Sequence, residues 1–237
     1  MLKRNKIARI EKRYAKLKES LVKSGIAGIC LDIDDTIAAA NVFFARKYHS
    51  SFGNPENLSP EEIIAKYRYV RNVPYWQDPI KQHIMEEGFW LGEHVSFSTP
   101  TSQAKEAVLE IDKTIPISLY LTGRPYRFYN QTCEWLNQYE FPQRRMIMEP
   151  ERSLLERLNV VDGNEWKARL LEFLFPEIVG TIDDNSDIAK LISPNYKGLI
   201  FLYSHNSSYS NKYNVIPCPT WEDTKMEINK IFRGRNS

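Results

Sequence analysis

A short apolar run that ends abruptly in carboxylates is the feature that most constrains the fold of this chain. Residues 25–31 read Gly-Ile-Ala-Gly-Ile-Cys-Leu, and residues 32–36 follow as Asp-Ile-Asp-Asp-Thr. The run is typical of a buried parallel strand, whose carboxyl end opens into the crevice where α/β proteins bind ligands. Because side chains alternate along an extended chain, Asp32 and Asp34 project to the same side and repel each other. The pair therefore predicts a site that holds a divalent cation or a shared proton.

Segments with strand-like and helix-like patterns alternate along most of the chain. This alternation predicts an α/β fold, a Rossmann-like parallel sheet with helices on both faces. We expect Thr122-Gly123-Arg124-Pro125 to end the second strand and Ser186 to cap the helix after the fourth. After the first strand, the predicted strands are 115–121, 146–148, 178–182 and 199–202, and the last helix is 221–232.

Residues 38–95 interrupt the strand-helix rhythm with a helical pattern rich in aromatic residues. Ser59 and Glu62 form a capping-box pattern, and Asp78 followed by proline is a second helix start. We therefore expect an inserted helical cap at 38–95 and a core domain of 25–37 and 96–237. Most of the aromatic side chains should pack inside the cap, and some of them could instead line a substrate pocket.

The first 24 residues differ from the rest in charge. They hold nine lysines and arginines against two glutamates, whereas the whole chain has a net charge of +2, so the remaining residues are net acidic. Spacings of three and four place one apolar stripe on a basic amphipathic helix over 1–24. This stripe comprises Ile7, Ile10, Tyr14, Leu17 and Leu21. We expect it to pack on its own domain or on a second copy in a homodimer; an arm that binds nucleic acid or a membrane surface is the alternative.

Composition excludes several classes of protein. The chain has 237 residues with 42% hydrophobic and 26% charged residues, which suits one α/β core with a small extra subdomain. Its apolar stretches are much shorter than the roughly 18 residues of a membrane span. The three cysteines show no Cys-x-x-Cys spacing and the four histidines no i, i+4 pair, which argues against a zinc site. We expect a cytoplasmic protein.

Four groups of polar residues stand in order along the chain, at predicted strand ends or helix starts. They are Asp32-x-Asp34-x-Thr36, Thr122-Gly123-Arg124, Lys167 and Asp183-Asp184-x-x-Asp187. Each has a simple explanation alone, because aspartate and threonine cap helices and Thr-Gly is a common turn. Their joint order over residues 25–190 resembles the haloacid dehalogenase superfamily of phosphatases.

The resemblance implies separate roles for the aspartates. Asp32 would be the nucleophile that takes the phosphoryl group, and Asp34 the acid that protonates the leaving oxygen and later activates water. Converging carboxylates on a phosphate dianion need a cation, and an all-oxygen ligand set favours Mg²⁺. In the family pattern the metal would be held by Asp32, the main-chain carbonyl of Asp34 and Asp183, with Asp187 bonding a metal-bound water. Asp184 as a ligand is an open alternative.

The resemblance also implies residues that contact substrate, in the second and third motifs. Thr122, next to Gly123, would hydrogen-bond a phosphoryl oxygen, and Lys167 would neutralise developing charge. Arg124 would either bind substrate or tie down its own loop. Asp35 points away from its neighbours and is expected to cap a helix.

Shorter motifs point to subgroups of the superfamily. The aromatic cap resembles the 5′(3′)-deoxyribonucleotidases, as do Gly88-Phe89-Trp90, Ser204-His205-Asn206 and Trp221-Glu222-Asp223. By contrast, Thr122-Gly123-Arg124 looks more like acid phosphatases or the phosphatase part of polynucleotide kinases. These resemblances imply different substrates.

The sequence therefore gives three hypotheses. The first is a Mg²⁺-dependent phosphatase of small phosphomonoesters, with nucleoside monophosphates among the candidate substrates. The second is a phosphatase of nucleic-acid ends, whose basic helix holds the strand. The third is a non-catalytic binding protein with the same fold.

Overall fold

A six-stranded parallel sheet forms the centre of the molecule in the computed structural model, which describes residues 2–158, 160–207 and 214–233. The strand order is β3-β2-β1-β4-β5-β6. The strands are β1 Gly28–Leu31, β2 Ile117–Pro125, β3 Arg145–Glu149, β4 Ile178–Asp183, β5 Leu199–Tyr203 and β6 Val215–Cys218. The helices are α1 Leu2–Ser24, α2 Ala40–Phe52, α3 Pro60–Tyr67, α4 Pro79–Leu91, α5 Glu93–Phe97, α6 Ala104–Thr114, α7 Tyr129–Gln138, α8 Arg152–Leu155, α9 Gly163–Leu174, α10 Ser186–Leu191 and α11 Trp221–Phe232.

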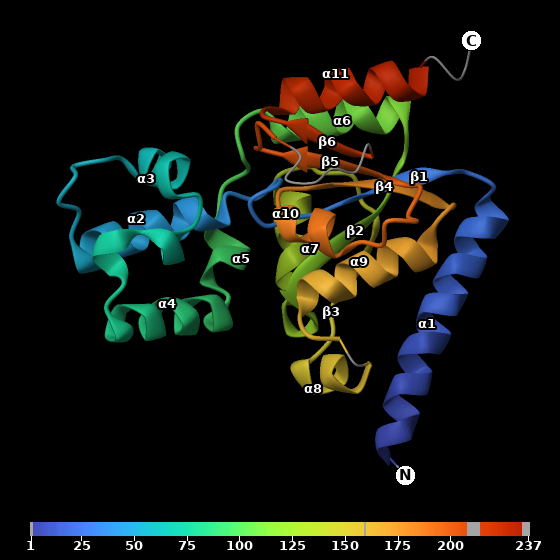
Figure 1. Cartoon of the computed structure of the whole chain (residues 1–237), viewed down its shortest axis with the longest axis horizontal. Helices are drawn as coiled ribbons and strands as arrows, with labels where there is room; N and C mark the ends of the chain where they lie inside the picture. The colour runs from blue at the N-terminus through green and yellow to red at the C-terminus, as the bar shows by residue number, and fades with distance from the viewer. Residues whose placement is uncertain (1, 159, 208–213, 234–237) are drawn as a thin grey trace.

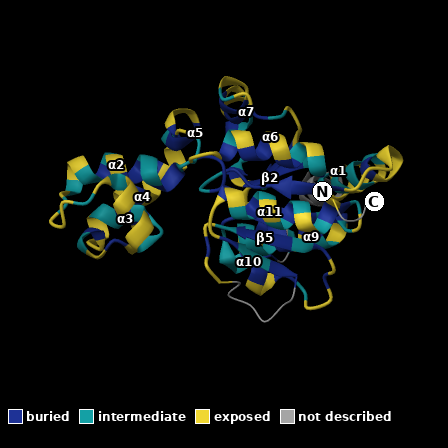
Figure 2. Cartoon of the chain, turned by 90° about the horizontal axis from the view of Figure 1, so that it is seen from above, coloured by how far each residue is buried: buried dark blue, intermediate teal, exposed yellow. Residues whose placement is uncertain are grey.

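Helices cover both faces of the sheet, as the alternating pattern predicts (Figure 1). Ile29 and Leu31 of β1 pack with α6, α7 and α11, whereas Cys30 between them packs with α1, α9 and α10. Because side chains alternate, a strand buried on both faces has to be apolar throughout. The strands are accordingly buried, and the covering helices turn exposed sides outward (Figure 2). The predicted fold class is confirmed.

The central position of β1 brings two carboxylate-bearing strand ends together. Strand β1 pairs with β4 in the register Leu31 with Ile182, and the amide of Asp32 donates to the carbonyl of Ile182 at 3.0 Å. Asp32 and Asp183 therefore leave neighbouring strands at the same edge of the sheet. This edge is where ligands bind in open parallel sheets.

Three local details differ from the sequence prediction. Strand β2 does not end before Thr122 but continues to Pro125, with an irregularity in its pairing to β3 between these two residues. The helix after β4 is capped by Asn185, whose side chain accepts from the amide of Asp187, rather than by Ser186. Strand β6 was missed, because Val-Ile-Pro-Cys is short and contains proline.

Helices α2 to α5, which we call the cap, lie to one side of the sheet (Figure 1). Ser59 and Glu62 form the predicted capping box at α3, and Asp78 caps α4. The cap has an apolar cluster of its own, which includes Phe44, Tyr48 and Trp76. Helix α5 runs through the predicted boundary at 95/96 and contacts α7 of the core.

The basic helix α1 packs on its own domain. Tyr14, Leu17 and Leu21 join the apolar cluster that α9 forms with the sheet, and the hydroxyl of Tyr14 accepts from the indole of Trp166 at 3.0 Å. The side chain of Ile7 falls outside what the structure describes. A homodimer stays a prediction. No helix in the described ranges combines the length and the hydrophobicity needed to cross a bilayer.

Candidate active site

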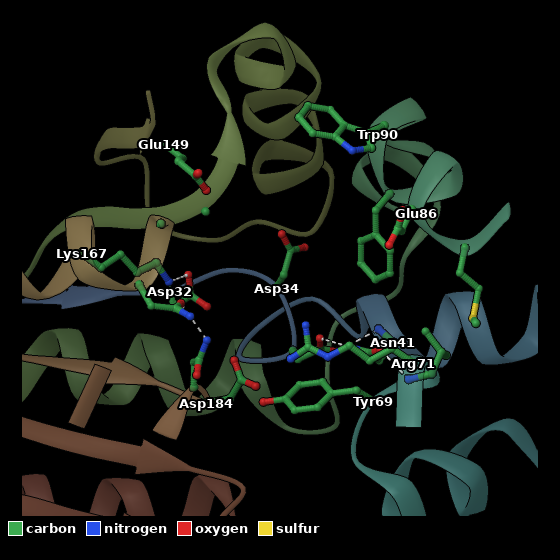
Figure 3. A pocket seen from close by; sticks show the side chains of 18 of the residues that line it. Asp32, Asp34, Asn41, Tyr69, Arg71, Glu86, Trp90, Glu149, Lys167 and Asp184 are labelled. Atoms are coloured by element: carbon green, nitrogen blue, oxygen red, sulfur yellow. Dashed lines mark hydrogen bonds and ion pairs between the residues drawn. The ribbon is translucent and has the colours of Figure 1, made fainter. Parts of the chain in front are cut away.

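Three buried carboxylates and one lysine form a cluster at the carboxyl edge of the sheet. Asp32, Asp183 and Asp184 each offer an oxygen within 4.8 Å of the other two. Lys167, from α9, donates to Asp32 Oδ1 at 2.6 Å and to Asp183 Oδ2 at 3.0 Å. None of these four residues is more than 5% exposed. The first, third and fourth of the predicted motifs therefore come together in space, and Figure 3 shows Asp32, Lys167 and Asp184 from them.

The cluster holds three carboxylates but only one lysine. Burial raises the pKa of Asp32 to about 7 and that of Asp184 to about 8, and neighbouring carboxylates add to both shifts. Burial alone would lower the pKa of Lys167, but Asp183 and Asp32 raise it above its ordinary value. The lysine thus stays charged, and the three carboxylates repel one another unless a further cation or protons relieve them.

The donor set fits a divalent metal. Three carboxylate oxygens that converge in a buried place form a hard, anionic ligand set, as Mg²⁺ and Ca²⁺ require, and they lack the sulfur and imidazole groups that favour zinc. Asp184, whose ligation the sequence left open, belongs to this set. Asp187 does not belong to it: its carboxylate pairs with Lys190 at 2.8 Å and is 47% exposed. A water-mediated role for Asp187 stays a prediction.

Asp34 lies beside the cluster but is engaged by other groups. Arg124 donates to it through Nη2 at 2.7 Å and through Nε at 3.0 Å, and His94 Nε2 lies 3.9 Å from Oδ2. Burial would raise the pKa of Asp34, yet the charge of Arg124, together with that of His94 when it is protonated, lowers it below its ordinary value. Burial lowers the pKa of His94 itself, so Arg124 is the permanent counter-charge. The carboxyl group is therefore held in its ionised form.

The second motif is placed largely behind the site. Arg124 is 2% exposed; besides binding Asp34 it donates to Thr132 and lies 5.9 Å from the ring of Trp135. Thr122 is also buried, and its hydroxyl accepts from the amide of Arg124 at 3.2 Å. Gly123 lines the cavity. The side chain of Arg124 contacts Asp34 of the first motif and Thr132 and Trp135 of α7 rather than its own loop, so neither of the two roles considered for it is confirmed. Direct substrate contacts by Thr122 and Arg124 stay predictions.

The loop after Asp32 is fixed by hydrogen bonds from both near and distant residues. Asp35, with a φ of 58°, accepts from the backbone and side-chain amides of Asn41 near the start of α2, so it does help to cap a helix. Thr36 Oγ1 donates to Asp184 Oδ1 and accepts from the amide of Asp184. These bonds tie the first motif to the fourth.

A cavity of about 540 Å³ opens above the cluster, between core and cap. Asp32, Lys167 and Asp184 lie on its core side, while Tyr69 and Trp90 face them from the cap (Figure 3). The cap thus places aromatic side chains opposite the carboxylates. A cavity of this size, with carboxylates and a lysine at one end, suits a small molecule with one anionic group.

Sequence reasoning missed three residues of the site. Glu149 ends β3 and lines the cavity, where burial raises its pKa to about 7; it could have been found as another strand-end carboxylate. His94 is buried beside Asp34, which its position in the cap did not indicate. Arg68 reaches from the cap to Asp184 at 3.0 Å across 116 residues of sequence, and no local signal could have predicted that contact.

Comparisons with known proteins find only distant likenesses. No family model and no curated protein matches the chain. Similar solved structures include a haloacid dehalogenase family hydrolase from Deinococcus radiodurans with bound phosphate and sodium (TM-score 0.45, 12% identity, 86% of this chain and 88% of that one). A second is a haloacid dehalogenase-like hydrolase from Xanthomonas campestris (TM-score 0.44, 13% identity, 89% of this chain and 99% of that one). A third is cytosolic 5′-nucleotidase IIIB bound to cytidine (TM-score 0.38, 15% identity, 93% of this chain and 91% of that one). The two hydrolases belong to the superfamily that the four motifs resemble. Likenesses at these TM-scores carry no information about activity.

Proposed function

We propose that this protein is a Mg²⁺-dependent phosphatase that hydrolyses small phosphomonoesters through a phosphorylated Asp32. The observation that carries the proposal is the cluster of Asp32, Lys167, Asp183 and Asp184, because all but Asp183 line a cavity that Tyr69 and Trp90 line from the cap. A cation held by the three carboxylates would supply the positive charge that a phosphate dianion needs to approach them. Nucleoside monophosphates are candidate substrates, because Tyr69 and Trp90 offer flat surfaces opposite the cluster.

In the first half-reaction, a carboxylate oxygen of Asp32 attacks phosphorus and the bond from phosphorus to the leaving oxygen breaks. Lys167, which lies 2.6 Å from Asp32 Oδ1, is placed to stabilise the charge that develops on the phosphoryl oxygens. The leaving oxygen takes a proton from Asp34. This step requires a protonated Asp34, so the ion pair with Arg124 has to loosen when substrate binds.

In the second half-reaction, water attacks the phosphorus of phosphorylated Asp32, and Asp34 accepts a proton from that water. The ionised Asp34 that Arg124 and His94 favour is the form this step needs. The observed pairing of Asp34 therefore suits hydrolysis of the intermediate. Inorganic phosphate and the regenerated Asp32 carboxylate are the products.

A phosphate-release screen tests the proposal. It covers nucleoside monophosphates, sugar phosphates and phosphate-ended oligonucleotides, each with Mg²⁺ and with a chelator. We expect release from at least one small phosphomonoester, lost with chelator and restored by excess Mg²⁺. Absence of Mg²⁺-dependent release from every substrate would refute the proposal and favour a non-catalytic binding protein.

The raised pKa values of the cluster give a stability test of the cation site. Asp32 and Asp184 have folded-state pKa values of about 7 and about 8, against about 3.9 in an unfolded chain. The folded state thus holds protons that the unfolded state has released, and this contribution to stability falls as pH rises from about 4 to about 8. We expect Mg²⁺ to raise the melting temperature more at about pH 8 than at about pH 5, because protons no longer compete for the carboxylates.

Thermal unfolding with Mg²⁺, and with Na⁺ at equal ionic strength as the control, measures this difference. An equal effect of Mg²⁺ at both pH values would contradict a cation site built from these carboxylates.

A second cavity favours one further candidate function, the removal of phosphate from the ends of single-stranded nucleic acid. This cavity, of about 490 Å³, shares Trp90, Glu149 and Gly163 with the first one. Trp90 and Tyr126 on its rim are each more than half exposed, which suits base stacking. Arg127 and Arg152 line this cavity. Arg13 of α1 lies near it, with its guanidinium carbon 5.6 Å from the centre of the Tyr126 ring. Glu149, Glu151 and Asp162 line it as well, so its charge is mixed.

Charge reversal in the second cavity separates this candidate from a phosphatase of small molecules only. If oligonucleotide ends are substrates, Arg13→Glu with Arg152→Glu should lower kcat/KM for them by about tenfold or more, with a weaker salt dependence. Turnover of p-nitrophenyl phosphate should not change. Lys197→Glu is the matched control, since Lys197 is exposed and precedes β5, which β2, β1 and β4 separate from β3 in the sheet. Absence of phosphate release from oligonucleotide ends, or release that the charge reversal leaves unchanged, would rule this candidate out.

A further inference from the structure

Arg68 of the cap is bonded to the core at the cation site. Its Nη2 donates to the carbonyl oxygen of Asp184 at 2.9 Å and to Asp184 Oδ2 at 3.0 Å. Its Nη1 donates to the carbonyl oxygen of Ser204 at 2.9 Å and to the hydroxyl at 2.8 Å. The planar guanidinium thus joins the end of α3 to two loops of the core with four hydrogen bonds. Bonds from a charged donor in this fork geometry are among the stronger ones in proteins.

The backbone at Arg68 is in a conformation that costs energy. Its φ is 69° and its ψ is −48°, and the amide of Tyr69 donates to the carbonyl of Tyr67 at 2.8 Å. This is the rare and strained form of the γ-turn, which few residues with a side chain adopt. Ser204, at the other end of the contact, also has a positive φ of 60°. Such positions persist only where other interactions offset the strain, and here the four bonds of Arg68 do so.

Arg68 and Lys167 form ion pairs with different carboxylates of the cluster. Lys167 bonds Asp32 and Asp183, whereas Arg68 pairs with Asp184. The direct ion-pair partner of Asp184 therefore comes from the cap, while Lys167 of the core acts on it more weakly from a distance. A divalent cation bound by the same carboxylates would repel the guanidinium and compete with it for Asp184.

We propose that Arg68 is a positioning residue that couples closure of the cap to occupancy of the cation site. Without a cation, Arg68 holds Asp184 and keeps the cap against the core. A divalent cation that binds Asp184 weakens this contact, so cation binding and closure of the cap oppose each other. Because coupling between two binding events is reciprocal, loss of Arg68 has to strengthen cation binding. The inference rests on the proposed cation site and adds a link between that site and the cap.

Calorimetric titration of the whole protein with Mg²⁺ tests the sign of this coupling. Arg68→Met keeps much of the side-chain length and removes the charge, and we expect it to bind Mg²⁺ about five- to tenfold more tightly than the wild type. A merely structural role would leave the affinity unchanged or weaken it. Arg68→Lys keeps the charge without the fork and should lie between the two. Arg71→Met is the matched control: Arg71 lies on the same segment and, among the described residues, forms no ion pair, so its loss should change the affinity much less.

Hydrogen exchange of residues 60–72 gives a second measurement that does not depend on activity. In the wild type, Mg²⁺ should speed exchange there, whereas in Arg68→Met exchange should be fast already and insensitive to Mg²⁺. If Arg68→Met does not fold, Ser204→Gly tests the same point. It keeps the charge of Arg68, suits the positive φ at position 204 and removes the hydroxyl that accepts from Arg68. Like Arg68→Met, it should tighten Mg²⁺ binding and speed exchange of residues 60–72. Unchanged or weaker Mg²⁺ binding by the folded variants, or slower exchange in the wild type with Mg²⁺, would overturn the inference. A wild type that binds no Mg²⁺ would refute the cation site itself.

Discussion

Asp32→Asn is expected to lower kcat for phosphomonoester hydrolysis by about four orders of magnitude or more, since an amide cannot form the phosphorylated intermediate. The change is nearly isosteric, and it removes one of three buried carboxylates that repel one another. The fold should therefore survive, with a melting temperature in the absence of metal at or above that of the wild type. Phosphate release and thermal unfolding measure the two effects on the same preparation.

Asp78→Asn is the matched control for this substitution. Asp78 caps α4 through its carboxylate, and asparagine caps helices about as well as aspartate. This variant should keep both activity and stability. If Asp32→Asn retains a substantial part of the wild-type rate, Asp32 is not the nucleophile.

Lys167→Met is expected to have the largest combined effect on stability and rate. The lysine is the cation that serves both Asp32 and Asp183 in a place where all three side chains are almost fully buried. Its loss leaves two buried carboxylates without their positive counter-charge, which costs about 3–5 kcal/mol of unfolding free energy when they are ionised. In the presence of Mg²⁺, kcat should fall by about 100- to 1000-fold, because one stabilising contact to the phosphoryl oxygens is lost.

Lys190→Met is the control for Lys167→Met, because it removes a lysine from an ion pair that is exposed rather than buried. Lys190 pairs with Asp187 at 2.8 Å, but both side chains are about half exposed. Loss of an exposed pair costs about 0–1 kcal/mol. Denaturant unfolding of both variants in chelator at about pH 8 measures the difference. Equal losses would show that the buried cluster does not depend on Lys167.

The predictions from sequence succeeded where the chemistry is encoded locally. The apolar run before Asp32 and the one before Asp183 placed two carboxylates at strand ends, and a parallel sheet brings such ends to one edge. The capping signals at Ser59 and Asp78 worked for the same reason, because a cap involves residues within one turn.

Other features depend on contacts between distant segments and had no local signal. Asp184 lies in the cluster, where Thr36 and Arg68 bond it from elsewhere in the chain. Spacing alone favoured Asp183 as the ligand, with Asp187 acting through a water, and left ligation by Asp184 open. Arg124 was expected near the phosphate or its own loop, and it pairs with Asp34 from the extended end of β2. The turn signal at 122–125 was overridden by pairing with β3.

Direct detection of the phosphorylated enzyme tests the central claim most sharply. Asp34→Asn is mixed with p-nitrophenyl phosphate and Mg²⁺, quenched in acid and digested for peptide mass spectrometry. This leaving group needs little protonation, whereas breakdown of the intermediate needs the carboxylate of Asp34, so the intermediate should accumulate. We expect a phosphoryl adduct on the peptide that contains Asp32. The double variant Asp32→Asn with Asp34→Asn should show no such adduct. Phosphate release without an adduct at any quench time, or an adduct on another residue, would contradict the account.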